Sequence, residues 1–288
     1  MTLKDEFARA RDNGSAIAHF NVSDSTQFNA VLRAAKRADE PVAIGVSEGE
    51  GEFIGMGVLA GMVKAARDEG ARVYLNADHS YSIERAKHAI DLGFDSVIID
   101  GAKLSFDENI AMTRALAAYA KGSEKEVLVE GELGYIGTSS KIHATLPEGV
   151  AITEEAMTSP EELSRFIAET QVNLIAPSVG NVHGIIASGE PRLSIRRIEA
   201  LAAASSVPLV LHGGSGTLDE DFVAAIKAGI RMVHINTELR VAYRKGLDAG
   251  LAADAEEVAP YRFLKAGADA VEEVAYRRIM LFSNRVSL

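Results

Sequence analysis

Eight short runs rich in β-branched residues alternate with eight longer amphipathic stretches, and this alternation constrains the fold more than any other feature. The expected strands are 16–20, 41–46, 72–76, 96–100, 127–130, 174–177, 208–211 and 232–236. The expected helices are 26–38, 55–69, 82–92, 107–121, 160–170, 194–204, 218–228 and 238–250. Buried strands that alternate with helices predict a parallel sheet. Eight such units, at a spacing of about 30 residues, favour a closed (β/α)8 barrel over the alternative, an open doubly wound sheet.

The length of 288 residues fits one barrel with an addition at its C-terminal end. A barrel of this kind takes about 250 residues, and a further amphipathic pattern covers 261–282. We therefore expect a single α/β domain over residues 1–288, a TIM barrel, with 261–282 as an appended helix that packs on the barrel or on another subunit. The longest irregular stretch, 134–158, follows the fifth strand, and such a long loop in a compact barrel is typical of a lid.

Charge and composition exclude several classes of function. The chain has 30 Lys and Arg against 41 Asp and Glu, a net charge of −11, which disfavours binding to nucleic acids. It has no cysteine, so any metal must bind to His, Asp or Glu. No apolar run reaches the ~18 residues of a membrane helix, and the N-terminus lacks the apolar segment of a signal peptide. We expect a cytoplasmic protein with no nucleic-acid and no membrane partner.

Polar residues gather just after the expected strands, which is where the active sites of barrels lie. His79, His183 and His212 follow the third, sixth and seventh of these strands. Three imidazoles and an open position are the ligand set of a catalytic zinc, whereas each histidine alone could equally bond a neighbouring carbonyl. Asp78 precedes His79 and is suited either to proton transfer or to orienting that imidazole.

A glycine-rich segment, His212-Gly-Gly-Ser-Gly216, joins the seventh strand to a helix. Its glycines allow close approach of the backbone, and free N–H groups near a helix N-terminus attract an anion. A phosphate site near the seventh and eighth strands is usual in barrels, and a plain tight turn is the alternative. Five further polar residues lie at strand ends and are expected at the substrate site: Asn21, Ser47, His234, Asn236 and Thr237.

In five motifs between Ala16 and Phe282 the chain resembles the class II, metal-dependent fructose- and tagatose-bisphosphate aldolases. The motifs are Asp78-His79, Glu130-Gly-Glu-Leu-Gly134, Gly180-Asn-Val-His-Gly184, His212-Gly-Gly-Ser-Gly216 and Asn236-Thr-Glu-Leu239. The resemblance implies a (β/α)8 barrel that forms a homodimer or homotetramer. It also implies a divalent metal, commonly Zn²⁺, and a monovalent cation, Na⁺ or K⁺, near the phosphate.

The same resemblance implies a role for each matching residue. His79, His183 and His212 would bind the metal, and Asp78 would take the proton of the hydroxyl on the carbon that becomes the aldehyde. Glu132 matches a family glutamate that can contact the metal in an alternate position. The residues that would hold the phosphate are Gly184, Gly213, Gly214 and Ser215.

The implied reaction is the reversible aldol cleavage of a ketose 1,6-bisphosphate to dihydroxyacetone phosphate and glyceraldehyde 3-phosphate, through an enediolate that the metal stabilises. Fructose 1,6-bisphosphate is the first expectation for the substrate. Tagatose 1,6-bisphosphate is the alternative, since the two differ only in configuration at C4.

Three positions depart from the family pattern. His234 stands where the family has an asparagine, and Asn236 is the next amide on the same strand face. The loop segment Gly137-Thr-Ser-Ser-Lys141 lacks the carboxylate that exchanges the C3 proton, and the short tail 283–288 offers no placeable arginine for the distal phosphate. For the C3 proton we rank Glu132 first, His143 second and Glu148 third.

Three other functions remain open from the residues alone. A Schiff-base aldolase would use a lysine, for which Lys103 is the best candidate. A metal-dependent hydrolase of the amidohydrolase type would have a His-x-His pair on the first strand, and the segment Ala18-His19-Phe20-Asn21 lacks the second histidine. A non-catalytic sugar-phosphate-binding barrel is the third, supported by the missing loop carboxylate.

Overall fold

A closed barrel of eight parallel strands forms the centre of the computed structural model, which describes residues 1–137, 141–150, 152–187 and 192–285. The hydrogen-bonded order around the barrel is β1-β10-β9-β7-β5-β4-β3-β2. The strands are β1 (Ile17–Asn21), β2 (Val42–Val46), β3 (Val73–Ser80), β4 (Ser96–Ile99), β5 (Leu128–Leu133), β7 (Leu174–Pro177), β9 (Leu209–Leu211) and β10 (Ile230–Ile235). Every run expected to be a strand belongs to the barrel, so the predicted fold class is confirmed.

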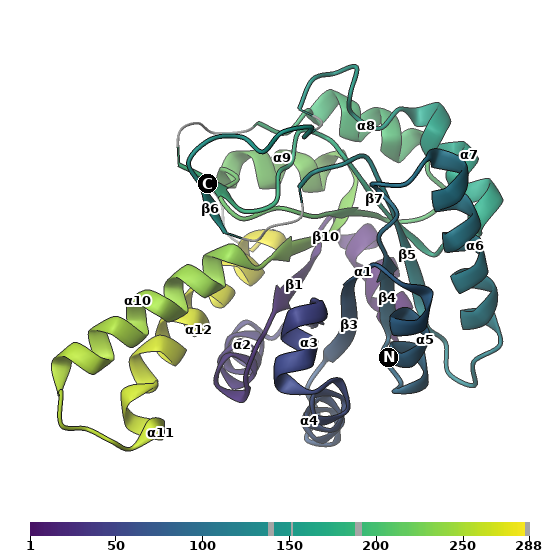
Figure 1. Cartoon of the computed structure of the whole chain (residues 1–288). Helices are drawn as coiled ribbons and strands as arrows, with labels where there is room; N and C mark the ends of the chain where they lie inside the picture. The colour runs from purple at the N-terminus through teal and green to yellow at the C-terminus, as the bar shows by residue number, and fades with distance from the viewer. Residues whose placement is uncertain (138–140, 151, 188–191, 286–288) are drawn as a thin grey trace.

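Helices surround the barrel and cover its outer face (Figure 1). The eight expected ones are α2 (Ser25–Ala38), α4 (Met56–Asp68), α5 (Ile83–Asp91), α6 (Phe106–Lys121), α7 (Pro160–Thr170), α8 (Ile195–Ala204), α9 (Asp219–Ala228) and α10 (Thr237–Ala253). Between them and the strands lies the larger hydrophobic core, which includes the outward-facing Ala18 and Phe20 of β1. The alternation of side chains along each strand then directs the intervening residues into the barrel.

Inward-facing residues change from apolar to polar along the barrel axis. On β1 the inward series is Ile17, His19 and Asn21, and Ile17 and His19 pair in register with Met232 and His234 of β10. Ile17 and Met232 belong to an inner hydrophobic cluster, whereas both histidines are buried polar residues. The apolar layer therefore lies at the N-terminal ends of the strands, and the polar layers at their C-terminal ends.

An N-terminal helix that the sequence analysis did not predict, α1 (Leu3–Asn13), closes the apolar end of the barrel. Its Leu3, Phe7 and Ala10 are buried and belong to the inner cluster, together with Tyr74 and Met232. Because α1 covers this end, the opposite end of the barrel is the one at which inward polar side chains meet a cavity.

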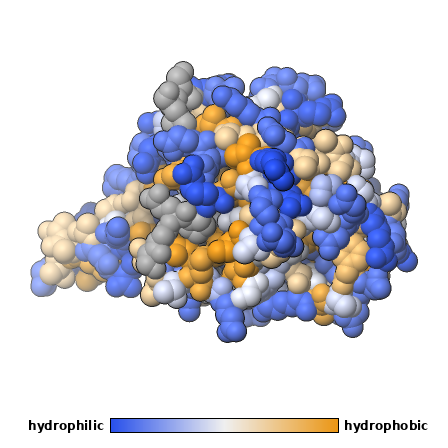
Figure 2. Space-filling model, turned by 90° about the horizontal axis from the view of Figure 1, so that it is seen from above, coloured by the Kyte–Doolittle hydropathy of each residue, from blue (hydrophilic) through white to orange (hydrophobic). Residues whose placement is uncertain are grey.

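The appended segment is not the single helix expected over 261–282. It consists of α11 (Pro260–Phe263) and α12 (Lys265–Phe282), which are separated at Leu264. α12 packs along α10 and against α2, and α10 and α12 form an arm that leaves one side of the barrel (Figure 1). The arm also projects from the body when the molecule is viewed from above (Figure 2).

Three short elements that were also not predicted shape the C-terminal end of the barrel. α3 (Glu48–Ile54) directly follows β2, and β6 (Ile142–His143) pairs in parallel with β8 (Ile185–Ile186). This pairing joins the long loop after β5 to the loop after β7. Among the described residues, no helix is both long and apolar enough to cross a membrane.

Candidate active site

A cavity of about 370 Å³ opens at the C-terminal ends of the barrel strands. All nine residues expected to bind substrate or phosphate line it, together with Asp78, His79 and His183. They come from loops and strand ends that are far apart in sequence. The closed barrel therefore brings residues predicted at separate strand ends to one cavity.

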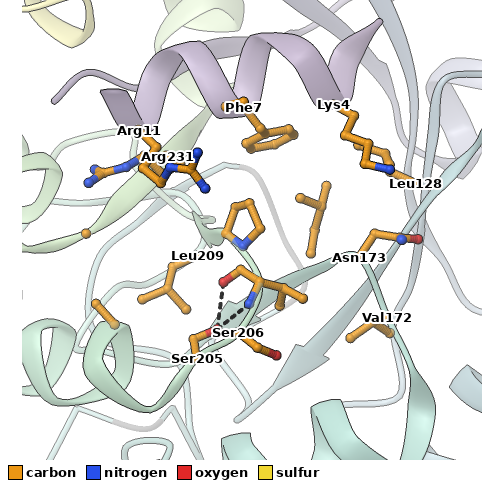
Figure 3. A pocket seen from close by; sticks show the side chains of 16 residues that line it. Lys4, Phe7, Arg11, Leu128, Val172, Asn173, Ser205, Ser206, Leu209 and Arg231 are labelled. Carbon is orange, nitrogen blue, oxygen red and sulfur yellow. Dashed lines mark hydrogen bonds between the residues drawn. The ribbon is translucent and has the colours of Figure 1, made fainter. Parts of the chain in front are cut away.

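A larger cavity, of about 550 Å³, lies at the opposite end, between α1 and the loops that precede β7, β9 and β10 (Figure 3). Phe7 and Leu209 contribute to its apolar walls, and Lys4, Arg11 and Arg231 are its charged groups. No histidine, aspartate or glutamate is among its lining residues. Because it offers neither a metal ligand nor an acid–base pair, size does not identify the active site here.

The three histidines expected to bind metal meet at the polar end of the barrel. One ring nitrogen from each of His79, His183 and His212 lies within 4.8 Å of those from the other two, and all three residues are buried. Nδ1 of His212 is 3.0 Å from Nε2 of His79.

Hydrogen bonds on the outer nitrogens orient these rings. Nδ1 of His183 donates to the carbonyl oxygen of Gly137 over 2.6 Å, and Nε2 of His212 donates to the carboxylate of Glu130 over 2.7 Å. Nδ1 of His79 lies 3.1 Å from Asp100 Oδ2 and 3.1 Å from Glu132 Oε2. Since these partners can only accept, each outer nitrogen carries the proton.

The inner nitrogen of each ring therefore carries a lone pair whenever that ring is neutral, and the inner nitrogens of His79 and His212 face each other. Two lone pairs at 3.0 Å repel unless a cation or a proton lies between them. Burial, followed by the charges of His79 and His212, lowers the pKa of His183 to about 3, which keeps that ring in the neutral form that binds metals. The donor set thus fits a divalent metal.

The backbone at the end of β3 is irregular where it presents His79. The register between β3 and β4 shifts between Ala77 and Ser80, and His79 has a φ of +45°. A positive φ is costly for a residue with a Cβ and is found mostly where the surrounding structure imposes it. The bulge therefore turns His79 away from the regular alternation of the strand, next to Asp78.

Asp78 places a carboxylate beside these histidines. Its Oδ2 accepts a hydrogen bond of 2.8 Å from Asn21 Nδ2, and its Oδ1 lies 3.4 Å from Nδ1 of His234 and 3.6 Å from Nε2 of His79. Burial opposes ionisation, but His79 and His234 outweigh it and hold the pKa of Asp78 well below its usual range. Asp78 is therefore a carboxylate that lines the cavity beside His79 and His234.

Comparison with known proteins agrees with this geometry. The model of the family described as "Fructose-bisphosphate aldolase class-II" matches residues 1–285. The chain belongs to this family. The aldolase is 32% identical to the fructose-bisphosphate aldolase of Staphylococcus aureus over 291 residues, which cover 99% of the chain and 98% of that protein. It is 31% identical to that of Geobacillus stearothermophilus, with 99% and 97% coverage.

A solved structure supports the same assignment. The crystal structure of the YdjI aldolase from Escherichia coli K12 superposes with a TM-score of 0.82 and 28% sequence identity, over 97% of this chain and 96% of that one. The resemblance inferred from the motifs is thus confirmed, and the protein is an aldolase, a carbon–carbon lyase. Family membership implies a divalent metal, for which the histidine cluster provides ligands.

The three residues ranked for exchange of the C3 proton do not line the aldolase cavity. Glu132 lies behind His79, on its Nδ1 side, where burial and the charge of Asp100 raise its pKa. His143 belongs to β6, and Glu148 is exposed. The segment 138–140, which belongs to the loop that lacks the family carboxylate, and the tail 286–288 lie outside the described residues.

His234, the departure from the family asparagine, is held between two other rings. It stacks on His19 with ring centroids 3.5 Å apart and on His212 with centroids 4.1 Å apart. A Cβ at position 45 of β2 would collide with the ring of His19, so Gly45 makes room for this stack. The aldolase therefore presents an imidazole, rather than an amide, at this point of the cavity wall.

Lys141, Arg240 and Glu130 were not predicted as site residues from the sequence. Lys141 and Arg240 line the cavity and supply positive charge near its rim, and Glu130 lies fully buried beneath His212. A signal existed for two of them. Glu130 shares the inward face of β5 with Glu132, and Arg240 lies one helical turn after Asn236 on α10.

Proposed function

We propose that this aldolase cleaves fructose 1,6-bisphosphate reversibly to dihydroxyacetone phosphate and glyceraldehyde 3-phosphate. The observation that carries the proposal is the cluster of His79, His183 and His212 at the cavity that His79, His183 and the Asp78 carboxylate line. Lys141 and Arg240 line the same cavity. Their charges suit a substrate with phosphate groups, although the chain as a whole is acidic.

His79, His183 and His212 would hold the metal, which we propose to be Zn²⁺, because three imidazoles with an open position are a common catalytic zinc site. When bound, the metal supplies Lewis-acid polarisation of the substrate ketone. From the family resemblance we also propose a monovalent cation, Na⁺ or K⁺, near the phosphate.

The phosphate of the dihydroxyacetone half would lie against Gly184, Gly213, Gly214 and Ser215. Gly213 has a φ of +63°, and a Cβ there would come within 2.6 Å of the carbonyl oxygen of Val182, so glycine lets the loops after β7 and β9 approach each other. The N-cap residue of α10, Asn236, makes no side-chain capping bond. Of the N–H groups at this helix end, that of Glu238 donates to Ser215 Oγ over 3.2 Å, and the positive end of the helix still favours an anion here.

Asp78 would act as the base that starts the cleavage. It takes the proton from the C4 hydroxyl, the C4 oxygen becomes the aldehyde, and the electron pair of the C3–C4 bond stays on C3. Protonation of C3 then completes the three-carbon product. The position of Asp78 on the cavity wall, with Oδ1 within 3.4 Å of His234 Nδ1 and 3.6 Å of His79 Nε2, supports this role.

A coupled assay that offers fructose and tagatose 1,6-bisphosphate separately tests the function, with metal content measured on the same sample. We expect turnover of the fructose substrate, complete loss of activity with a chelator, and no inactivation by borohydride in the presence of substrate. Inactivation by borohydride without sensitivity to the chelator would indicate a Schiff base instead. Lys103 is exposed and does not line the cavity, so Lys141 would then be the lysine to examine.

The same assay separates the remaining alternatives. Preference for tagatose 1,6-bisphosphate would change the substrate and leave the mechanism as proposed. Tight binding of a bisphosphate without turnover above the solution rate would identify a non-catalytic sugar-phosphate-binding barrel.

Glu132→Gln is expected to slow exchange of the C3 proton of dihydroxyacetone phosphate by about 10²-fold or more, because a positioned acid–base group contributes that much. Release of tritium from C3-labelled dihydroxyacetone phosphate measures this step separately from carbon–carbon cleavage. Since Glu132 lies behind His79, it must move to the cavity in order to act. Unchanged exchange would exclude Glu132, and the same measurement on His143→Ala and Glu148→Gln would then decide between the other two.

We also propose that the protein is a homodimer or homotetramer. At the far end of the arm that α10, α11 and α12 form, Leu251, Val258 and Tyr261 are exposed. Such apolar side chains on a projecting element are typical of a surface that a second subunit covers.

A further inference from the structure

Glu50 is a buried carboxylate that does not line the cavity but contacts four residues that do. It lies in α3, is 5% exposed, and has no role in the metal cluster. Its Oε2 accepts hydrogen bonds from Asn21 Nδ2 and from the backbone N–H and hydroxyl of Ser47, at 2.7–2.8 Å. Its Oε1 accepts from Asn236 Nδ2 at 3.3 Å and from the guanidinium of Arg240.

These bonds determine which end of each amide is turned toward Glu50. A carboxylate only accepts, so the NH₂ group of Asn21 and that of Asn236 must be the ends that face it. Asn21 uses its second N–H on the carboxylate of Asp78, at 2.8 Å. The opposite orientation of this amide would place its oxygen against two carboxylates.

As a result, the carbonyl oxygens of the two amides receive no hydrogen bond from Glu50 or Asp78. Oδ1 of Asn21 and Oδ1 of Asn236 are buried and have no hydrogen-bond partner among the described residues. Both residues line the cavity. A buried acceptor without a partner is costly, and a hydroxyl group is the donor that a sugar chain offers.

We propose that Glu50 is a positioning residue that determines substrate specificity: it orients the amides of Asn21 and Asn236 so that both present acceptor oxygens to the hydroxyl groups of an open-chain sugar phosphate. The inference rests on the proposed function, since it takes a phosphorylated polyol chain as the ligand. The guanidinium of Arg240 also donates to Glu50 and compensates its negative charge. The same contact holds the Arg240 side chain at the cavity rim.

The test compares Glu50→Gln with wild type by titration calorimetry on the metal-loaded protein. Two ligands that are not cleaved serve as probes: a hexitol 1,6-bisphosphate, which carries hydroxyl groups, and hexane-1,6-diol bisphosphate, which has none between its phosphates. Glutamine retains the size of the side chain but places a donor beside the amides, so the amide of Asn236 can turn over, whereas that of Asn21 is then held by Asp78 alone. We expect wild type to bind the hexitol ligand more tightly than the hexanediol ligand. In Glu50→Gln the ratio of the two affinities should fall by about 10-fold or more, because one or two hydrogen bonds contribute that much.

Glu52→Gln is the matched control, because Glu52 lies on the same helix and is exposed. It should keep the wild-type preference, and all three proteins should keep the same metal content. In the cleavage assay, Glu50→Gln should raise KM more than it lowers kcat, which a simple loss of folded protein would not do.

The possible results separate the inference from the function on which it rests. If Glu50→Gln weakens both ligands by the same factor, or changes neither, Glu50 does not set the polarity of the amides and the inference is wrong. If wild type binds neither bisphosphate and cleaves no ketose bisphosphate, the proposed function fails instead.

Discussion

His212→Ala is expected to lose bound metal and aldolase activity together, with kcat/KM reduced at least about 10³-fold. The change removes one of the three imidazoles that meet at the proposed metal position. Charge stabilisation by a metal is worth several kcal/mol, and about 1.4 kcal/mol corresponds to each factor of ten in rate. Elemental analysis of the purified variant and the coupled assay on the same sample measure both effects.

A second variant separates loss of the metal from loss of the folded structure. Removing the imidazole leaves Glu130, which is fully buried, without the donor that it has over 2.7 Å, and an unpaired buried charge is strongly destabilising. His212→Gln restores a donor for Glu130 and should fold, yet still lose the metal. His88→Ala, at an exposed histidine of α5, is the control and should retain both properties. Full metal content and activity in His212→Gln would remove His212 from the metal site.

Asp78→Ala is expected to lower kcat by about 10²–10⁴-fold while metal content stays largely intact, because a positioned acid–base group contributes that much to a rate. Asp78 lines the cavity, whereas its contact to the nearest inner nitrogen, Nε2 of His79, is 3.6 Å long and is not needed to orient that ring. The orientation comes from Asp100 and Glu132 on the other nitrogen. Steady-state kinetics and metal analysis of one preparation measure the two quantities.

Asp78→Asn is the matched variant, since it preserves the volume of the side chain but cannot take the proton. It should show the same loss of kcat as Asp78→Ala. Near-normal turnover in either variant would show that Asp78 only orients its neighbours. Loss of metal in both variants would instead show that Asp78 is a metal ligand.

The elements of this fold could be predicted because each is encoded locally. A strand such as 174–177 is a short apolar run, and a helix such as 160–170 begins at a serine followed by proline, so neighbouring residues alone determine the pattern. α1 escaped prediction for the opposite reason. Its sequence is charged and precedes the first strand, and its role as a cover of the barrel depends on the inner cluster that Phe7 joins.

The histidines of the site were also accessible from the sequence, because a parallel barrel always gathers the C-terminal ends of its strands. That rule brings His79, His183 and His212 together without any knowledge of their side-chain contacts. The rule does not predict whether a side chain at a strand end lines the cavity or packs behind a residue that does. Glu132 was therefore ranked as a base from its motif, whereas the structure places it behind His79.

The sequence by itself thus determined the barrel and the end of it at which the three histidines gather, since periodicity and strand-end position are properties of short segments. Only the tertiary structure decided the roles that depend on contacts between distant segments. Glu50 and Arg240 meet across 190 positions of the chain, and Glu130 reaches His212 across 82. No local pattern encodes such pairs, because closure of the barrel alone brings their strands and helices to the same end.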